Sequence, residues 1–227
     1  MITKITWYGH ATLGIQTGKY FLLVDPFFSG NPQASATAGD LNPDYILVTH
    51  GHADHIGDTV SIARRSGALV ICNAEIASWL THQGVKTHAQ HLGGGHNHPF
   101  GYLKMTFALH GSGLPDGSNG GNPGGFLLTT LGGQKIYVAG DTGLFGDMRL
   151  IGEEGLDLSI LPIGDNFTMG PEDALRAVKL LTPKNVIPIH YNTFPIIKQD
   201  ANLWAERVRT ETKTLVTLLK PGDSLQL

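Results

Sequence analysis

One stretch of nine residues organises the chain: Thr49-His50-Gly51-His52-Ala53-Asp54-His55-Ile56-Gly57. It follows the apolar run Tyr45–Val48, which has the length and the branched residues of a short buried strand. Three histidines and one aspartate therefore leave the end of a strand in a turn, where glycines permit backbone conformations that a Cβ would forbid. We expect a helix to follow, with Asp58 as its N-cap and Gly67 at its end.

The donor atoms of this stretch suit a metal site. Imidazole nitrogens and carboxylate oxygens bind Zn²⁺, Fe²⁺, Mn²⁺ and Ni²⁺. His50 and His52 can reach one ion from the same side of an extended segment, whereas Asp54 and His55 begin the turn and can face a second ion. Such crowding is typical of a two-metal site rather than of a single four-ligand zinc site. The alternative is a polar loop that is merely rich in histidine, which the strand before it and the helix after it disfavour.

The motif H-G-H-A-D-H resembles the H-x-H-x-D-H signature of the metallo-β-lactamase superfamily. That superfamily also uses a later histidine, a bridging aspartate in a Gly-Asp-Thr-like turn and a last histidine after a strand. This chain offers His110, Asp141 within Ala139-Gly140-Asp141-Thr142-Gly143, and His190, in the expected order. Two further segments resemble the small, uncharacterised metal-dependent hydrolases related to L-ascorbate-6-phosphate lactonase: Trp7-Tyr8-Gly9-His10-Ala11 and Asp25-Pro26-Phe27.

The resemblance covers nearly the whole chain and implies one α/β domain over residues 1–227, a four-layer αββα sandwich. It also implies two divalent metal ions, with zinc foremost and manganese, nickel or iron as the alternatives. Seven ligands would hold them: His50, His52 and His110 on the first ion, Asp54, His55 and His190 on the second, and Asp141 as the bridge.

This ligand set favours hydrolysis. Two divalent cations, two carboxylates and one bridging hydroxide leave a net charge of about +1 when the histidines are neutral, so the site attracts anions. Coordination lowers the pKa of water from ~16 to about 7, so a bridging hydroxide can act as the nucleophile at neutral pH. Oxygen-reducing di-iron relatives have a glutamate where this chain has His52, and a neutral ligand there disfavours redox chemistry.

Other polar residues near the motifs are candidates for supporting roles. Asp54 and His10 are the catalytic candidates; His10 could donate a proton or bind an anion, and it could equally be structural. Asp25 is expected to accept a hydrogen bond from a ligand histidine. Four residues that follow strands are candidates for substrate binding, with loop packing as the alternative for each: Asp165, Met169, Tyr191 and Asn192.

Composition limits the function classes. The chain has 227 residues, 41% of them hydrophobic and 15% charged, with a formal net charge of −3 and no basic stripe, so a nucleic-acid partner is not expected. Cys72 is alone, which excludes an internal disulfide and fits a reducing cytoplasm. No signal peptide and no apolar run of about 18 residues is visible, so no membrane partner is expected.

Three functions compete on these grounds. The first is hydrolysis of a small anionic ester, lactone or phosphodiester, by a chain that could form a homo-oligomer. The second is a metal-dependent nuclease of the RNA-processing type, which the negative charge and the short chain disfavour. The third is a non-enzymatic metal-binding protein, which needs fewer ligands than this chain offers.

A second histidine-rich segment extends from His88 to His98 and contains the run Gly93-Gly94-Gly95. We expect it to be flexible and to leave the catalytic metals to the ligands named above; the resemblance gives His91 a role in supporting a loop. The other expected strands span residues 2–8, 12–17, 20–25, 68–72, 102–109, 126–131, 134–139, 157–162, 185–189 and 214–218. The other expected helices span residues 74–83, 144–154, 171–181 and 203–210.

Overall fold

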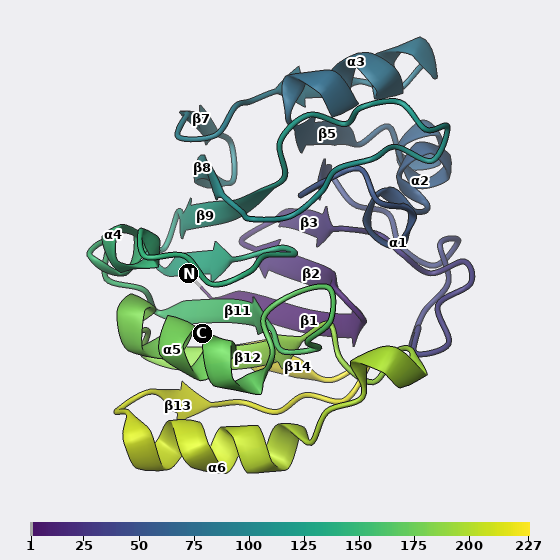
Figure 1. Cartoon of the computed structure of the whole chain (residues 1–227). Coiled ribbons are helices and arrows are strands. Elements are labelled where there is room, and N and C mark those ends of the chain that lie inside the picture. The colour runs from purple at the N-terminus through teal and green to yellow at the C-terminus, as the bar shows by residue number, and fades with distance from the viewer. Residues whose placement is uncertain (1) are drawn as a thin grey trace.

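The computed structural model describes residues 2–227 and contains two seven-stranded sheets (Figure 1). The first sheet has the spatial order β14 (Ser224–Gln226), β1 (Thr3–Gly9), β2 (Thr12–Thr17), β3 (Tyr20–Val24), β4 (Tyr45–Leu47), β5 (Leu69–Cys72) and β6 (Thr87–Ala89). The second has the order β13 (Leu215–Val216), β12 (Asn185–Ile189), β11 (Leu158–Pro162), β10 (Lys135–Val138), β9 (Gly124–Thr130), β8 (Gly101–Phe107) and β7 (Gly95–His98).

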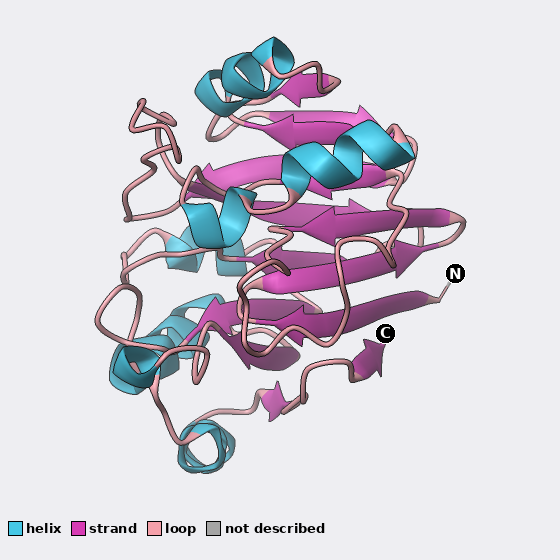
Figure 2. Cartoon of the chain, turned by 90° about the vertical axis from the view of Figure 1, so that its right-hand side faces the viewer, coloured by secondary structure: helices cyan, strands magenta, loops and turns pink. Residues whose placement is uncertain are grey.

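Helices lie outside both sheets (Figure 2). Beside the first sheet lie α1 (Ala53–Ile56), α2 (Thr59–Ser66) and α3 (Ala74–His82). Beside the second sheet lie α4 (Met148–Gly152), α5 (Pro171–Leu181) and α6 (Ala201–Glu211), and a 3₁₀ turn, η1 (Pro195–Ile197), precedes α6. This order of layers is the αββα sandwich that the sequence predicts. Within residues 2–227, no helix is both long and apolar enough to cross a bilayer.

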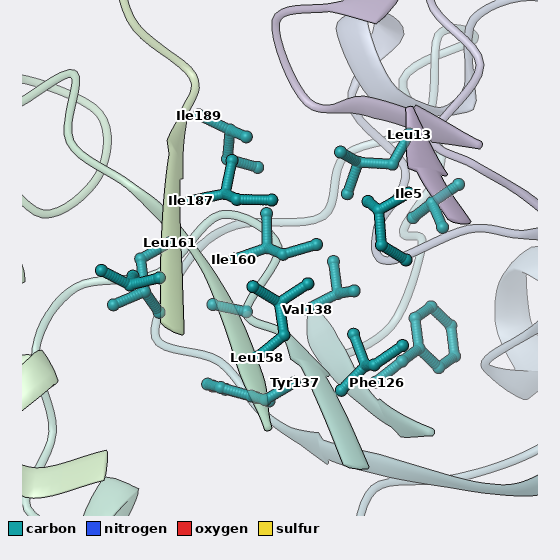
Figure 3. Packing of buried hydrophobic residues seen from close by; sticks show 14 of the residues in the cluster. Ile5, Leu13, Phe126, Tyr137, Val138, Leu158, Ile160, Leu161, Ile187 and Ile189 are labelled. Carbon is teal, nitrogen blue, oxygen red and sulfur yellow. The ribbon is translucent and has the colours of Figure 1, made fainter. Parts of the chain in front are cut away.

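The main hydrophobic core lies between the two sheets. Ile5 and Leu13 of the first sheet face the second sheet, where Val138, Ile160 and Ile187 come from three adjacent strands (Figure 3). All five side chains are almost completely buried. β11 is buried at every position, as expected for a central strand that is covered on both faces. This core fixes the distance between the sheets, and with it the distance between the loops that follow their strands.

A second cluster of buried side chains lies between the first sheet and its helices. Ile46 and Val70 of the sheet pack with Ile62 of α2 and Leu80 of α3. The α2 sequence TVSIARRS turns its few apolar residues to this side and exposes both arginines. The helix after the histidine motif is therefore held against the sheet, and it fixes the turn from which it starts.

Parallel strands place the candidate ligands at one edge. β3, β4 and β5 are parallel in the first sheet, and β10, β11 and β12 are parallel in the second. Carboxyl ends of parallel strands meet at the same edge of a sheet, which is where open α/β folds bind ligands. The histidine motif follows β4, Asp141 follows β10 and His190 follows β12.

The turn after β4 differs from the expectation. A short helix, α1, carries Asp54 and His55, so the helical region begins inside the motif rather than at Asp58. Asp58 is the residue before α2, but its carboxylate does not cap that helix; it accepts hydrogen bonds from the Phe28 and Ser29 amides, both at 2.9 Å. The prediction of its capping bond is therefore wrong, because a loop distant in sequence competes for the same carboxylate. Gly67 ends α2 with φ of 75°, as expected.

The run Gly93–Gly95, expected to be flexible, is paired with β8 in the structure. The two ends of the segment from His88 to His98 lie in β6 and β7. The amide of Gly93 donates to the Met105 carbonyl at 2.8 Å, and the Met105 amide donates to the Gly94 carbonyl at 2.9 Å. Pairing with β8 therefore overrides the conformational freedom of the glycines.

Other boundaries also differ from those expected. α4 is shorter than residues 144–154, and β13 is shorter than residues 214–218. Three strands, β6, β7 and β14, were not predicted; β14 pairs antiparallel with β1 and extends the first sheet.

Candidate metal centre

The first group of candidate ligands is formed by His50, His52 and His110. The His52 Nδ1 atom lies 3.0 Å from His50 Nε2 and 3.2 Å from His110 Nε2. The ring centroids are 4.6 Å apart for His50 and His52, and His110 lies 5.0 Å from each. Three imidazole nitrogens therefore converge within 4.8 Å of one another, a spacing that one metal ion can span.

The second group contains Asp54, His55 and His190, with His10 beside them. One donor atom from each of these four residues lies within 4.8 Å of the others. α1 supplies Asp54 and His55, whereas His190 follows β12 in the other sheet. The first group is divided in the same way: His50 and His52 follow β4 of the first sheet, and His110 follows β8 of the second. Each group therefore takes residues from both sheets.

Asp141 lies between the two groups. Its Oδ2 atom is 3.0 Å from His190 Nε2 and 3.3 Å from His55 Nε2, and it is 3.6 Å from His110 Nε2. The preceding Gly140 has φ of 64°, and a Cβ there would lie 2.9 Å from a backbone oxygen. Glycine is required at that position, and the turn it permits points the carboxylate at both groups.

The electrostatics favour the metal-binding forms of Asp141 and His50, whereas the charges of Asp141 and Asp25 outweigh burial and raise the pKa of His55 well above its usual value. Burial alone would raise the pKa of Asp141, but His190 and His55 outweigh it and hold the pKa of that carboxyl well below its usual value. Burial lowers the pKa of His50 well below its usual value, with His55 adding to the effect. An ionised aspartate and a neutral histidine are the forms that bind a metal ion.

Several polar atoms in the centre have no hydrogen-bond partner in the described part of the chain. They are His55 Nε2, both ring nitrogens of His190, and Asp141 Oδ1, and all are buried. An unpaired buried polar atom costs about 1–3 kcal/mol. These residues therefore fit a bound cation. It would be coordinated by nitrogen and oxygen atoms that have no hydrogen-bond partner within the described residues.

A hydrogen-bond network sets the tautomers of two ligand histidines. As predicted, Asp25 accepts a hydrogen bond from a ligand: His55 Nδ1 donates to its Oδ2 at 2.8 Å. The Thr49 hydroxyl also donates to Asp25 Oδ2, at 2.6 Å, so that hydroxyl oxygen can accept from His50 Nδ1, which lies 3.0 Å away. Both rings then carry their proton on Nδ1 and leave Nε2 free for a metal.

Backbone strain is concentrated at the same edge. Asp25, His10 and His190 have φ of 43°, 53° and 54°, and each follows a strand or lies in a turn between strands. The His190 amide donates to the His10 carbonyl at 3.0 Å, which fixes the two residues to each other. Non-glycine residues keep this conformation only where the surroundings impose it, and such residues concentrate at functional sites.

His10 contacts Asp54 from the buried side of the centre. Its Nε2 lies 3.1 Å from Asp54 Oδ2, and its Nδ1 lies 2.9 Å from the Thr193 hydroxyl. The His10 side chain is completely buried, whereas the Asp54 side chain is 34% exposed. Burial lowers the pKa of His10 to about 4. Only Asp54 of the two catalytic candidates can therefore reach solvent or substrate.

An open cavity of about 270 Å³ lies over the centre. It is lined by His52, Asp54, His110, Asp141, Phe167 and His190. The Phe167 side chain is 53% exposed, and it was not among the residues predicted to bind substrate. Its position between Asp165 and Met169, two of the predicted residues, is the signal that could have identified it.

The four candidate substrate residues lie outside this cavity wall. Met169 is buried, and its amide donates to the Thr142 carbonyl at 2.9 Å. The Tyr191 ring stacks on Trp7, with centroids 5.6 Å apart, and the Asn192 side chain accepts a hydrogen bond from the Gln199 amide. The carboxylate of the fourth, Asp165, accepts a hydrogen bond from the next amide in the loop. Substrate contact by these four stays a prediction.

The chain is similar to known proteins over most of its length. The beta-lactamase superfamily domain matches residues 20–191. A UPF0173 metal-dependent hydrolase of Thermus thermophilus is 49% identical over 226 residues and covers 100% of both chains. Another, of Heliobacterium modesticaldum, is 48% identical over 231 residues, covering 98% of this chain and 97% of its own.

A solved structure is similar to this chain over its full length. The structure of a metallo hydrolase from the hyperthermophilic archaeon Ignicoccus hospitalis superposes with a TM-score of 0.92 at 34% identity, covering 100% of this chain and 99% of that one. The similarity to these relatives and to this structure extends over 98–100% of the chain. The chain therefore belongs to the beta-lactamase superfamily and is a metal-dependent hydrolase with the metallo-β-lactamase fold.

Proposed function

We propose that this hydrolase binds two divalent metal ions and cleaves a small anionic ester, lactone or phosphodiester. One observation carries the proposal: Asp141 Oδ2 lies 3.0–3.6 Å from ligand nitrogens of both groups, as a bridging carboxylate would. The donors are histidine and aspartate, a set that suits zinc best and also accepts manganese, nickel or iron.

The seven candidate ligands would be divided between the two ions. His50, His52 and His110 would hold one ion, Asp54, His55 and His190 the other, and Asp141 both. When bound, such a pair of ions acidifies a water molecule and polarises the oxygen of the scissile group. Asp25 and Thr49 accept the Nδ1 protons of His55 and His50, so Nε2 is the nitrogen of each ring that would face a metal ion.

Asp54 has a second role on the substrate side. Its carboxylate can only accept a hydrogen bond when ionised, so the contact with His10 is a hydrogen bond in the form of His10 that carries a proton on Nε2. Burial raises the pKa of Asp54, but the hydrogen bond from His10 and the charges of His55 and His10 together outweigh it and leave the pKa well below its usual value. We assign His10 as a positioning residue that orients Asp54, and Asp54 as the group that can meet a reacting proton.

Size and charge favour a small anionic substrate. Two carboxylates offset only half the charge of two divalent ions, so the centre would attract anions. The cavity of about 270 Å³ holds a small molecule, and the exposed Phe167 ring offers an apolar surface to its uncharged part.

The test combines metal analysis with a substrate screen. Metal content of the purified protein is measured after loading with Zn²⁺ or Mn²⁺, and hydrolysis is assayed on phosphodiesters, lactones and thioesters. We expect two equivalents at the centre and an activity that chelation abolishes and metal restores. Asp147→Asn is the matched control, because Asp147 is exposed and its side chain does not cap α4.

Two results would contradict the proposal. An activity that survives both chelation and His190→Ala would belong to another site. Cleavage of RNA with a steep dependence on salt, together with no hydrolysis of small molecules, would favour the nuclease instead.

A further inference from the structure

A groove with mostly apolar walls, which we call the lateral groove, lies beside the candidate metal centre. Its volume is about 380 Å³. The apolar residues that line it are Leu92, Phe107, Ala108, Leu109 and Pro123, and the remaining lining residues are His110 and Asn122. His110 is the only ionisable residue among them, so the groove offers no ion pair to a charged ligand.

His110 connects this groove to the centre. The same residue lines the lateral groove and the cavity over the candidate ligands. Its side chain is 13% exposed, and its Nε2 atom lies 3.6 Å from Asp141 Oδ2. The two cavities therefore meet at His110, and a molecule held at the centre can extend past this side chain into the groove.

Backbone hydrogen bonds fix the walls of the groove. The Leu109 amide donates to the Thr142 hydroxyl at 2.9 Å, and the Gly143 amide donates to the Leu109 carbonyl at 3.0 Å. On the other wall, the Gly124 amide donates to the Thr49 carbonyl at 3.0 Å. Thr142 follows the bridging aspartate, and Thr49 precedes the histidine motif. The groove is thus held by the segments that carry the candidate ligands, as is typical of a pre-formed binding site.

Large apolar side chains remain exposed along this path. Phe107 is 61% exposed and Leu109 is 55% exposed. A further cavity of about 180 Å³ also has Phe107 in its lining and reaches α4, where Phe145, Leu150 and Ile151 line it. Exposed apolar side chains that gather in this way mark binding grooves, because covering them removes apolar surface from water.

We propose that the lateral groove binds the unbranched acyl chain of an ester substrate whose scissile bond lies at the metal centre. The inference rests on the proposed function and names the part of the substrate that the centre does not hold. A charged group in the groove would lose its hydration without gaining an ion pair, whereas an acyl chain loses nothing. Because the path continues past Phe107 to α4, it favours a chain over a compact group.

The experiment uses the full chain loaded with Zn²⁺ and a series of acyl esters of para-hydroxybenzoate, from acetyl to octanoyl. All members share one anionic leaving group and differ only in the acyl chain. Each kcat/KM is divided by the rate constant for hydrolysis of the same ester by hydroxide, which removes differences in intrinsic reactivity. We expect this ratio to rise with chain length, by up to about four-fold for each methylene buried.

Three variants test whether the groove causes the rise. Leu109→Ala and Phe107→Ala should flatten the dependence on chain length, because each removes part of an apolar wall. Leu131→Ala is the matched control: Leu131 is also 55% exposed, and it lines neither the lateral groove nor the two cavities beside it. It should show the same dependence on chain length as the wild type.

A binding measurement distinguishes failure of this proposal from failure of the proposed function. The affinities of octanoate and butanoate for the Zn²⁺-loaded protein are measured by calorimetry. If no ester is hydrolysed but octanoate binds more tightly than butanoate, and Leu109→Ala loses the difference, the proposed hydrolysis fails and the groove stands. If the esters are hydrolysed at normalised rates that do not depend on chain length, the proposed function stands and the groove is overturned.

Two other results would also overturn the groove. The first is an equal flattening of the series in Leu131→Ala and Leu109→Ala. The second is a change of oligomeric state in Leu109→Ala, measured by sedimentation, which would make the exposed side chains an interface between copies of the chain.

Discussion

Replacing Asp25 with asparagine is expected to weaken metal binding although no ligand changes. The Asp25 carboxylate is 1% exposed and accepts three hydrogen bonds, from His55 Nδ1 at 2.8 Å, from the Thr49 hydroxyl at 2.6 Å and from the Thr49 amide at 2.8 Å. Asparagine has the same shape, but one of its two terminal atoms can only donate. Whichever way the amide is turned, at least one of the three donors then faces another donor.

The expected loss can be worked out from these contacts. The most favourable orientation keeps the two bonds to the Oδ2 position and loses the bond from the Thr49 amide. A hydrogen bond to a charged group contributes about 1.5–3 kcal/mol and a neutral one about 0.5–1.5 kcal/mol, so the two remaining bonds also weaken. We expect the free energy of unfolding to fall by roughly 3 kcal/mol. The bond that orients His55 weakens because its acceptor is no longer charged, and metal affinity should fall by about 10–100-fold.

Two measurements test this prediction. Metal affinity is obtained by competition with a chelator, and the free energy of unfolding from urea titrations of the metal-free protein. Asp44→Asn is the matched control, because the Asp44 carboxylate accepts one backbone hydrogen bond, from Phe21, at an exposed position. If Asp25→Asn bound metal with wild-type affinity and unfolded at the same urea concentration as the control, Asp25 would not orient His55.

Four further outcomes are expected. Asp141→Ala should reduce occupancy of both metals and His190→Ala of only one, measured by elemental analysis; equal losses would contradict a bridging role. Cys72 is buried and burial raises its pKa, so the native protein should resist a thiol reagent that labels it after denaturation; rapid native labelling would refute this. Gly57→Ala should lower the unfolding temperature, since φ is 28° and a Cβ would lie 2.4 Å from a carbonyl oxygen; an unchanged temperature would show that the turn relaxes. Phe167→Ala should raise KM more than it lowers kcat if the ring contacts substrate; unchanged steady-state kinetics would remove it from the wall.

The residues around the metal centre could be selected from the sequence because their spacing is tied to strand ends. The motif after Tyr45–Val48 has a density of donors that a loop acquires only rarely by chance, and His110, Asp141 and His190 each follow an apolar run. The structure brings all seven candidate ligands together. Asp25 could be predicted as a partner of a ligand histidine, since such ligands need one.

Substrate-facing residues could not be selected in the same way. Asp165, Asn166 and Asn192 have positive φ, which sends their side chains in directions that no periodic pattern encodes. Phe167 was missed because an exposed aromatic ring in a loop has no distinguishing spacing. Their placement depends on loop conformations that are set by tertiary contacts.

Long-range pairing explains the remaining differences in the fold. β14 is a three-residue strand with little pattern of its own, and it exists because β1 offers it an edge. Gly93 and Gly94 are ordered because β8 supplies their partners. In both places local propensity was overridden by a strand far away in the sequence.

The division of each ligand group between the two sheets has a consequence for biosynthesis. A nascent chain that has emerged only through β6 presents His50, His52, Asp54 and His55, but neither His110 nor His190. The 140 residues between His50 and His190 take roughly 7–28 s to translate at 5–20 residues per second. During that interval neither group of candidate ligands is complete, since each lacks the histidine that the second sheet's half of the chain supplies. If the centre binds metal as proposed, the full set of ligands is available only after the second sheet has docked.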